Sequence, residues 1–474
     1  MSAVPTQQTS AVPGRARGFL SGAREIDDAG IGVRGTLPPW LRGTLLLNGP
    51  ALWELPGGRL EHWFDGYAMW HALRIDGAGV RYRSRFCASE SYRRSIAAGA
   101  PAFGEFGTAN PAGLLARLKS PQVTDNPAVV MSRHGERWLS VTETPSLTYF
   151  DPGTLETLER VNLGRREEPM HLMSAHGFTL PDGSYLNVAT ALGPKCEMKL
   201  FRLAPGATRP QVIGRIRMPK SGYTHGFGLA PGHALVWETA LRAQPLAFRF
   251  GAKSYADNFR WEPGGGSTIH AVALDTGDVR SWRIAPMMAF HATQAWVDGR
   301  DLVLEIATYD DGVVFDDLRL ERRRAGLPMR SRMRHVRYRL RDGRRDAEAE
   351  PIAGVAIELQ QVHPERIGRG RARVCWGAGN GEHGELFDCT HRVDLDSGAV
   401  TTWRRPGATH LEPLFVPRPG GAEDDDGVLL VPTLSDDDET TVVGVLDART
   451  MNCVAELRAP QIVPFGFHAA FHWA

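Results

Sequence analysis

Four histidines of this chain lie in similar short apolar stretches, and their side chains could together bind a metal ion. The stretches are MSAHGFTL with His176, GYTHGFGL with His225, MAFHATQAW with His291 and PFGFHAAFHWA with His468. No two of them are close in sequence, which excludes a helical HExxH site and a zinc-finger ligand set. Imidazole binds Fe, Zn, Cu and Ni, so the residue type does not identify a metal. On these residues alone, a four-histidine metal site and four buried structural histidines both remain open.

Ligands so far apart in sequence require a fold that brings distant segments to one point. From about residue 40 onward, short stretches with period-two patterning, such as ALRIDGAGVRYRSRF and IHAVALDTGDVRSW, alternate with Asp-Gly, Asp-Pro-Gly and Thr-Gly turns. This pattern predicts antiparallel hairpins throughout, and long amphipathic helices are nearly absent. A closed all-β propeller accommodates this length without a linker better than a sandwich does, and its axis could collect the histidines. Because no WD-type repeat is visible, the blades must be divergent.

Two segments depart from the strand pattern. Residues 1 to 17 are rich in Pro, Ser and Thr, so we expect a disordered lead, with residues 18–474 forming one domain. Residues 91–120 are rich in Ala, Gly, Phe and Leu and suit short helices and loops. On a β scaffold this segment could be a dome or entrance over a binding cavity, a membrane contact, or a surface excursion packed on its own domain.

The overall composition restricts the class of partner and the compartment. The chain has 474 residues, 42% of them hydrophobic, and a net charge of +1, which argues against nucleic acid as the partner. Its five cysteines form no CxxC pair, which favours a reducing compartment and excludes a cysteine-ligated metal. No apolar run has the length of a signal peptide or a membrane span, so we expect a cytoplasmic protein. The acidic pieces EDDDG and SDDDET lack EF-hand spacing and are expected to be solvated hairpin tips.

From about residue 30 to the C-terminus, the ordered motifs resemble those of the carotenoid cleavage oxygenase family. The stretches that carry the resemblance include GTLPPWLRGTLLLNGPALWE, HWFDGYAMWHALRIDG, TDNPAVV, TETPSLTYFDPGTLET, SAHGF, YTHGFGL, FHATQAW and VLDARTMNCVAELRAPQIVPFGFHAAF. Several of them are most similar to the branch that contains animal β-carotene oxygenases and the retinal pigment epithelium isomerohydrolase. The resemblance implies a seven-bladed β-propeller that holds a non-haem Fe(II) under a helical and loop dome enclosing an apolar tunnel.

The resemblance also implies roles for seven residues around the iron. The expected iron ligands are His176, His225, His291 and His468, whereas His472 falls outside the motif. Three glutamates would each hold one ligand by its second ring nitrogen: Glu143 for His225, Glu358 for His291 and Glu412 for His468. His176 is then left without a carboxylate partner, and no protein acid or base is expected beyond the iron centre.

The activity implied by the resemblance is cleavage of a conjugated C=C bond of a carotenoid or apocarotenoid by O2, giving retinal-like aldehydes. The apolar polyene suggests peripheral contact with a membrane. Stilbene-cleaving members bind a phenol through a tyrosine and a lysine, whose places are taken here by Phe106, an expected substrate contact, and Thr142. Leu47 and Gln294 also depart from the usual Arg and Asn. Cleavage of stilbenes or phenylpropenes, and an inactive propeller that only binds, are the alternatives.

Overall fold

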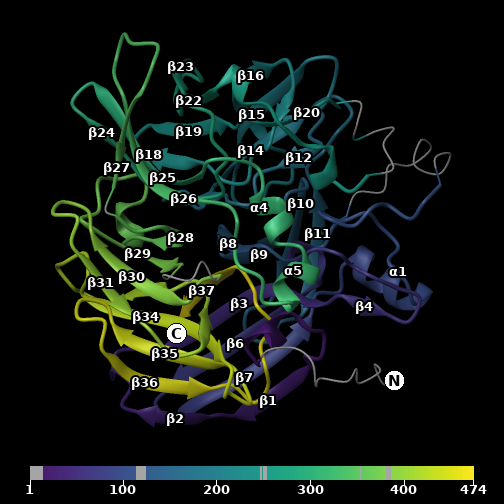
Figure 1. Cartoon of the computed structure of the whole chain (residues 1–474), viewed down its shortest axis with the longest axis vertical. Coiled ribbons are helices and arrows are strands. Elements are labelled where there is room, and N and C mark those ends of the chain that lie inside the picture. The colour runs from purple at the N-terminus through teal and green to yellow at the C-terminus, as the bar shows by residue number, and fades with distance from the viewer. Residues whose placement is uncertain (1–13, 114–123, 246–247, 249–252, 353, 381–385) are drawn as a thin grey trace.

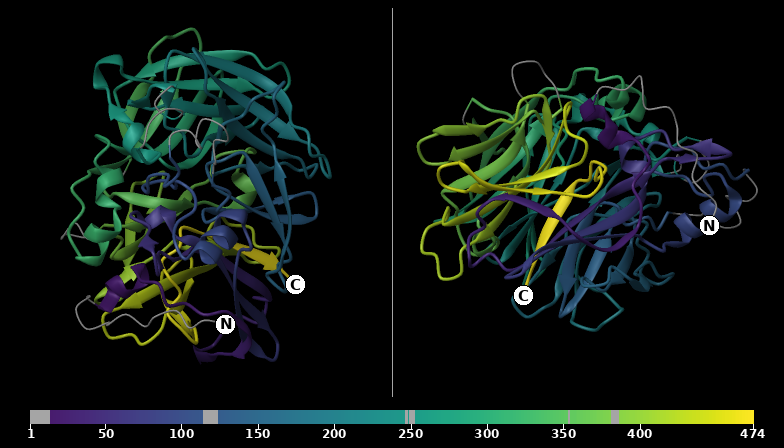
Figure 2. Two further views of the ribbon diagram at one scale, coloured as in Figure 1. Left: turned by 90° about the vertical axis from the view of Figure 1, so that its right-hand side faces the viewer. Right: turned by 90° about the horizontal axis from the view of Figure 1, so that it is seen from below.

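The computed structural model describes residues 14–113, 124–245, 248, 253–352, 354–380 and 386–474. Seven antiparallel sheets of four to six strands follow one another along the chain and are arranged around a common centre. Figures 1 and 2 show this ring of sheets, with the last strands of the chain beside the first ones. The predicted all-β fold and its seven blades are confirmed.

Each sheet is named here as a blade, numbered in chain order. Blade 1 has the order β1 (Ile26–Gly30), β7 (Gly79–Phe86), β6 (Tyr67–Asp76), β3 (Gly43–Leu52), β37 (His468–Trp473). Blade 2 has the order β11 (Thr157–Asn162), β10 (Ser146–Phe150), β9 (Arg137–Val141), β8 (Val130–His134). Blade 3 has β12 (Leu172–Met173), β14 (Tyr185–Ala191), β15 (Cys196–Leu203), β16 (Gln211–Met218), with β13 (Phe178–Thr179) also on β14.

The remaining blades have the same antiparallel meander. Blade 4 has β18 (Gly228–Ala230), β19 (His233–Glu238), β22 (Ser267–Ala273), β23 (Val279–Ile284). Blade 5 has β24 (Ala292–Asp298), β25 (Asp301–Tyr309), β26 (Met333–Leu340), β27 (Glu348–Pro351), and blade 6 has β28 (Ile357–Gln361), β29 (Val374–Gly379), β30 (Cys389–Asp394), β31 (Val400–Trp403). Blade 7 has β2 (Gly32–Gly35), β36 (Cys453–Arg458), β35 (Val442–Asp447), β34 (Gly427–Ser435), β32 (Ala408–His410), with β33 (Leu414–Pro417) on β34.

The two ends of the chain close the ring of blades. In blade 1 the last strand, β37, pairs with β3 from Gly43 opposite Trp473 to Asn48 opposite His468. In blade 7 the early strand β2 pairs with β36 near the end of the chain. Closure of this kind removes the open sheet edges between the first and last blades, and it places His468 on the inner edge of blade 1.

The blades differ in sequence but share a turn in which an aspartate replaces missing backbone hydrogen bonds. Between β10 and β11, the Asp151 carboxylate accepts from the backbone N–H groups of Gly153 and Thr154. Asp394 and Asp447 make equivalent bonds between the last two strands of blade 6 and between β35 and β36 of blade 7. The first of these turns is an Asp-Pro-Gly turn of the kind that the sequence analysis used to predict hairpins.

The hydrophobic core lies mainly between adjacent blades. Alternate residues of β3 face opposite sides, so that Leu45 and Leu47 pack toward blade 7 whereas Leu46 packs toward blade 2. An uninterrupted apolar run therefore marks a strand that is covered on both faces. Between blades 6 and 7, the rings of Trp376 and Phe415 stack at a centroid distance of 4.4 Å.

Short helices and loops cover one end of the propeller and form the expected dome. Its helices are α1 (Glu90–Ala98), α4 (Val314–Asp317) and α5 (Leu320–Arg324), with the 3-10 turns η2 (Trp63–Asp65) and η3 (Ala256–Asn258). The small sheets β4 (Glu54–Leu55) with β5 (Gly58–Arg59), and β17 (Ser221–Gly222) with β20 (Leu241–Ala243) and β21 (Arg260–Trp261), lie outside the blades. Two further 3-10 turns are η4 (Pro263–Gly265) and η5 (Pro364–Arg366). Of the predicted segment 91–120, residues 114–120 lie outside the described part of the chain.

The predicted disordered lead is wrong at its C-terminal end, while residues 1–13 lie outside the described residues. Residues 14–17 belong to the 3-10 helix η1 (Gly14–Phe19). There the backbone N–H of Arg15 donates to Asp436, and Phe19 packs edge-on against Trp63 at 5.4 Å. The composition of the segment could not predict these contacts, because the residues that it packs against lie in blade 7 and in the dome.

Candidate metal centre and substrate cavity

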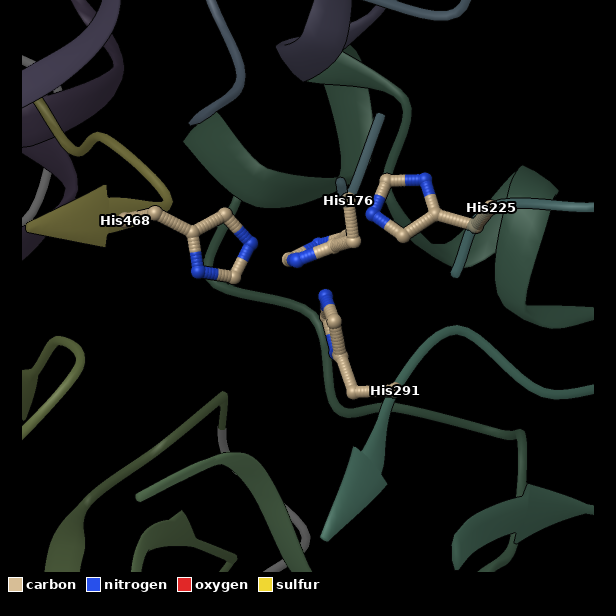
Figure 3. A group of neighbouring side chains, drawn as sticks. All are labelled: His176, His225, His291 and His468. Atoms are coloured by element: carbon tan, nitrogen blue, oxygen red, sulfur yellow. The ribbon is translucent and has the colours of Figure 1, made fainter. Parts of the chain in front are cut away.

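The four predicted histidines meet at the centre of the propeller. One ring nitrogen from each of His176, His225, His291 and His468 lies within 4.8 Å of the other three. Figure 3 shows the four rings converging from separate segments of the chain. Nitrogen ligands that share one ion with bonds of about 2.1 Å lie within roughly 4.2 Å of each other. The cluster therefore has close to the dimensions of a single metal site.

All seven blades contribute to this centre. The histidines come from blades 3, 4, 5 and 1: His176 lies between β12 and β13, His225 precedes β18, His291 precedes β24, and His468 begins β37. The remaining blades 2, 6 and 7 contribute glutamates: Glu143 follows β9, Glu358 lies in β28, and Glu412 lies between β32 and β33. A radial fold achieves this because every blade directs its inner edge to the axis.

Each of the three glutamates accepts a hydrogen bond from one histidine, in the pairs that the sequence analysis expected. Nδ1 of His225 lies 2.6 Å from Glu143 Oε1. Nδ1 of His291 lies 2.5 Å from Glu358 Oε2, and Nδ1 of His468 lies 2.8 Å from Glu412 Oε1. A carboxylate at Nδ1 holds the proton on that nitrogen, which leaves the lone pair of Nε2 free toward the centre.

The unpartnered atoms of the cluster test whether a metal fits. The Nε2 atoms of His176, His291 and His468 are buried without any hydrogen-bond partner. Burial, followed by the neighbouring histidines, lowers the pKa of His176 and of His291 well below the usual value, so both rings are neutral. Three buried Nε2 atoms without partners, aimed at one point, are unfavourable without a cation and are what an imidazole metal site requires.

The raised pKa of the Glu358 carboxyl shows that a negative charge beside this cluster is unfavourable without a metal. Burial is the main reason that the pKa of its carboxyl rises to about 7, although the Leu359 N–H donates to it at 3.1 Å. A divalent cation bound to His291 would favour the ionised carboxylate again, because an opposite charge offsets the desolvation. The donor set therefore fits a bound divalent metal better than an empty site.

His176 differs from the other three histidines. It is half-buried, as His291 is, but unlike the other three its Nδ1 makes no hydrogen bond with any residue in the described ranges. Its backbone is fixed instead: the His176 N–H donates to Ser174 Oγ at 3.1 Å, and that hydroxyl donates to the His225 carbonyl at 2.7 Å.

The cluster lies between two cavities of different character. The larger, of about 740 Å³, is on the dome side, and His225, His291 and His468 form part of its wall. Most of the rest of that wall is apolar, including Trp63, Phe64, Val129, Phe290, Leu318, Met333, Leu386 and Phe467. A second cavity of about 440 Å³ reaches His176 from the opposite side. An apolar chamber of the larger size accommodates an extended hydrocarbon beside the metal.

Phe106 and Thr142 both line the larger cavity, where the sequence analysis placed them. The Phe106 ring lies 5.0 Å from Phe64 and 6.2 Å from Tyr223, so it is part of an aromatic wall. Neither residue offers an ammonium group or a phenol. Both residues are thus part of the cavity wall.

Some residues at the centre were not found from the sequence. The Tyr223 hydroxyl donates to the same Glu143 oxygen that His225 uses. Gln361 Nε2 donates to Glu412 Oε1 at 2.9 Å, and the Ala469 N–H donates to Glu412 Oε2 at 2.6 Å. Tyr223 lies two positions before a ligand in YTHGFGL, and this was the one available signal.

Other residues of the stretches quoted in the sequence analysis have structural roles outside the histidine cluster. His62 caps η2 and shares a hydrogen bond with the Phe315 carbonyl at 2.9 Å, so HWFDG anchors the dome. The ring of His472 lies 5.5 Å from that of Trp138, outside the cluster. Gln294 donates to Glu305 at 2.8 Å and accepts from the Ala372 N–H at 2.7 Å, which ties blade 5 to blade 6.

Comparisons with known proteins agree on the class of protein. The family model described as retinal pigment epithelial membrane protein matches residues 19–472. The carotenoid cleavage dioxygenase 8 homolog A of Oryza sativa subsp. japonica, a chloroplastic protein, is 31% identical over 472 residues, covering 93% of this chain and 84% of that protein. The mitochondrial carotenoid-cleaving dioxygenase of Homo sapiens is 27% identical, covering 98% of this chain and 93% of its own length.

The fold has solved counterparts as well. A cobalt-substituted apocarotenoid oxygenase of Synechocystis superposes with a TM-score of 0.83, covering 97% of this chain and 98% of the other, at 24% sequence identity. At that identity the similarity establishes the propeller fold, while the match to the family model rests on the sequence itself.

Proposed function

Because the chain belongs to the retinal pigment epithelial membrane protein family, which includes the carotenoid cleavage oxygenases, we propose that it is a non-haem Fe(II) dioxygenase. Its substrate would be a carotenoid or apocarotenoid, in which one conjugated C=C bond is cleaved by O2 to give two carbonyl products. One double bond and one O2 supply all the atoms of two aldehyde groups, so the reaction needs no separate reductant.

The observation that carries this proposal is the placement of a four-histidine cluster in the wall of a 740 Å³ apolar cavity. His176, His225, His291 and His468 would hold the iron through Nε2. When bound, Fe(II) supplies the activation of O2 that alkene cleavage requires. Four neutral ligands leave the 2+ charge of the ion intact, and the glutamates keep each ring in the tautomer that can bind.

The other residues of the site would act by binding and excluding water rather than by moving protons. The rings of Phe64, Phe290 and Phe467 form an apolar surface next to the cluster, with Phe64 4.9 Å from Phe467 and 6.1 Å from Phe290. A polyene lying on this surface has its π system beside the metal and is shielded from solvent. Positioning of one double bond is then the main contribution of the protein.

The alternative of a phenolic stilbene or phenylpropene substrate is less well supported. The tyrosine and lysine that bind the phenol in stilbene-cleaving members are replaced here by Phe106 and Thr142, which provide neither a phenol nor an ammonium group. An inactive binding propeller is disfavoured because all four histidines are present and each of the three glutamates is paired with one of them, as a metal site requires.

The apolar substrate also suggests where the protein works. No helix among the described residues is long and apolar enough to cross a membrane. We infer a cytoplasmic protein that contacts membranes peripherally to take up its substrate, through the part of the dome that includes α1, where Ile96 is exposed. Sedimentation with phospholipid vesicles checks this, and recovery of all the protein in the supernatant would contradict it.

Metal analysis combined with an aerobic assay tests the proposed function. The purified protein should contain about one iron per chain and convert β-carotene or a β-apocarotenal to aldehydes that chromatography can identify. Iron without cleavage of either polyene would redirect the search to stilbenes and phenylpropenes. Protein that binds no metal under any reconstitution condition would refute the oxygenase and favour a binding propeller.

A further inference from the structure

Three glutamates line the larger cavity, and one of them has no histidine partner. Glu143 and Glu358 hold His225 and His291. The third, Glu105, has a side chain that is only 5% exposed and lies in the same wall. Burying a carboxyl group against an apolar cavity is unfavourable unless a group in the cavity makes a hydrogen bond with it.

The contacts of Glu105 indicate which hydrogen bonds its carboxyl group can still make with a ligand. Thr124 Oγ1 donates to its Oε1 at 2.8 Å, and within the described ranges the carboxyl makes no other side-chain hydrogen bond and no ion pair. Burial, followed by the charge of Asp65, raises the pKa of Glu105 well above its usual range. Burial therefore favours the protonated acid over the carboxylate. Thr124 uses one acceptor, and the acid O–H remains as a donor.

The position of Glu105 is fixed relative to the metal centre. Its backbone N–H donates to the Thr108 carbonyl at 2.9 Å, and the adjacent Phe106 carbonyl accepts from the Ala256 N–H at 2.7 Å. The Phe106 ring lies 6.2 Å from Tyr223, which in turn stacks 6.3 Å from His225. Glu105 and three of the four histidines thus line one cavity, so a polyene bound beside the metal could bring one of its ends to Glu105.

We propose that Glu105 binds the oxygenated end group of an apocarotenoid and thereby determines which double bond lies beside the metal. This inference rests on the proposed function and specifies its substrate class. A carbonyl end group is the best match, because it accepts a hydrogen bond and cannot donate one. A purely hydrocarbon end would leave the acid O–H of Glu105 without an acceptor, and sites that hydrogen-bond a substrate group reject analogues that lack it.

The experiment compares two substrates of equal polyene length, a β-apocarotenal and its analogue with a methyl group in place of the aldehyde. We expect kcat/KM of the wild-type protein to favour the aldehyde by roughly 10- to 100-fold, with a single cleavage position. Glu105→Leu should reduce this preference to roughly threefold or less and give several cleavage positions. Glu105→Gln should retain most of the preference, because its amide N–H still donates.

Two controls separate this role from a structural one. Glu136→Leu makes the same exchange at a glutamate whose side chain is 98% exposed and lies outside the cavity, and it should keep the wild-type substrate ratio. Metal content and melting temperature identify any variant that folds poorly, and only variants matching the wild type in both are compared. A Glu105→Leu protein with the wild-type ratio and the wild-type cleavage position would overturn the proposal.

Binding measurements keep the inference separate from the proposed activity. Tryptophan fluorescence quenching gives the affinity of the metal-free protein for both compounds without any turnover. If the wild type cleaves neither compound, the proposed function fails, and the ratio of the two affinities in wild type and Glu105→Leu then decides the role of Glu105. A ratio that Glu105→Leu does not change would refute that role.

Discussion

The glutamates that hold the histidines differ in how many of their carboxylate oxygens accept hydrogen bonds. Exchanging Glu412 and Glu143 for glutamine should therefore lower the metal affinity by different amounts. Glu412 uses both carboxylate oxygens: Oε1 accepts from His468 and Gln361, and Oε2 accepts from the Ala469 N–H. Glu143 uses only Oε1, which accepts from Tyr223 and His225, while its Oε2 is buried without a partner. Glutamine keeps one acceptor oxygen but replaces the other by an NH2 group.

In Glu412→Gln, either orientation of the amide places its NH2 group against another donor. At least one hydrogen bond to a charged acceptor is lost, which costs about 1.5–3 kcal/mol, or roughly 10- to 150-fold in an equilibrium constant. An NH2 group facing His468 Nδ1 would also favour the tautomer that carries its proton on Nε2, and this tautomer cannot bind a metal. We therefore expect metal affinity to fall by about 100-fold.

In Glu143→Gln, the remaining oxygen can stay at the Oε1 position and the NH2 group replaces an oxygen that had no partner. Only the negative charge is lost, so we expect about a tenfold loss, the lower end of the usual effect of such exchanges. Calorimetric titration of the metal-free proteins with Co²⁺ measures both affinities, and thermal melts monitored by circular dichroism check the fold. Equal losses, or a larger loss in Glu143→Gln, in two well-folded variants would refute this reasoning.

Three further predictions concern the ligands, the acid stability and the substrate class. His291→Ala removes one of four ligands and should abolish stoichiometric iron binding; iron content by mass spectrometry equal to that of the wild type would exclude His291 as a ligand. Burial lowers the pKa of His71 to about 3, so its contribution to stability is complete above pH 6.5 and is lost as the pH falls toward 3. At pH 5 the loss is about 2 kcal/mol, and His71→Gln should show a correspondingly weaker dependence in urea unfolding at pH 7 and 5. Phe106→Tyr combined with Thr142→Lys should introduce cleavage of a phenolic stilbene, measured by chromatography; stilbene cleavage by the unaltered protein would contradict our view of these residues.

The sequence predicts the fold well because each hairpin is specified locally. Period-two runs and Asp-containing turns recur through all the blades, and the run LLL of β3 marks a strand that is buried on both faces. The number of blades and the role of the four histidines as iron ligands came from the resemblance of ordered motifs. Residue types alone left metal ligands and buried structural histidines undecided, because the distances between the four rings depend on closure of the whole ring.

Features that depend on partners from other blades could not be predicted. The acidic piece EDDDG, expected to be a solvated tip, instead buries Asp425 in ion pairs with Arg392 at 2.6 Å and Arg449 at 3.0 Å. Asp438 of SDDDET is likewise buried and paired with Arg405. A local run of acids looks solvated because the arginines that pair with it come from other hairpins. Glu105 was missed for the same reason, since its significance depends on the cavity that surrounds it.

The radial fold explains why metal binding and folding should be coupled in this protein. Every blade contributes one histidine or one glutamate to the centre, so the metal site exists only when the ring is closed. In the metal-free cluster, burial disfavours charge on Glu358 and on two of the histidines, and three Nε2 atoms are left without partners. A divalent cation favours the ionised form of Glu358 and gives the Nε2 atoms a partner. It binds the closed ring but not the open chain. The metal that the reaction requires would thus also hold the first and last blades together.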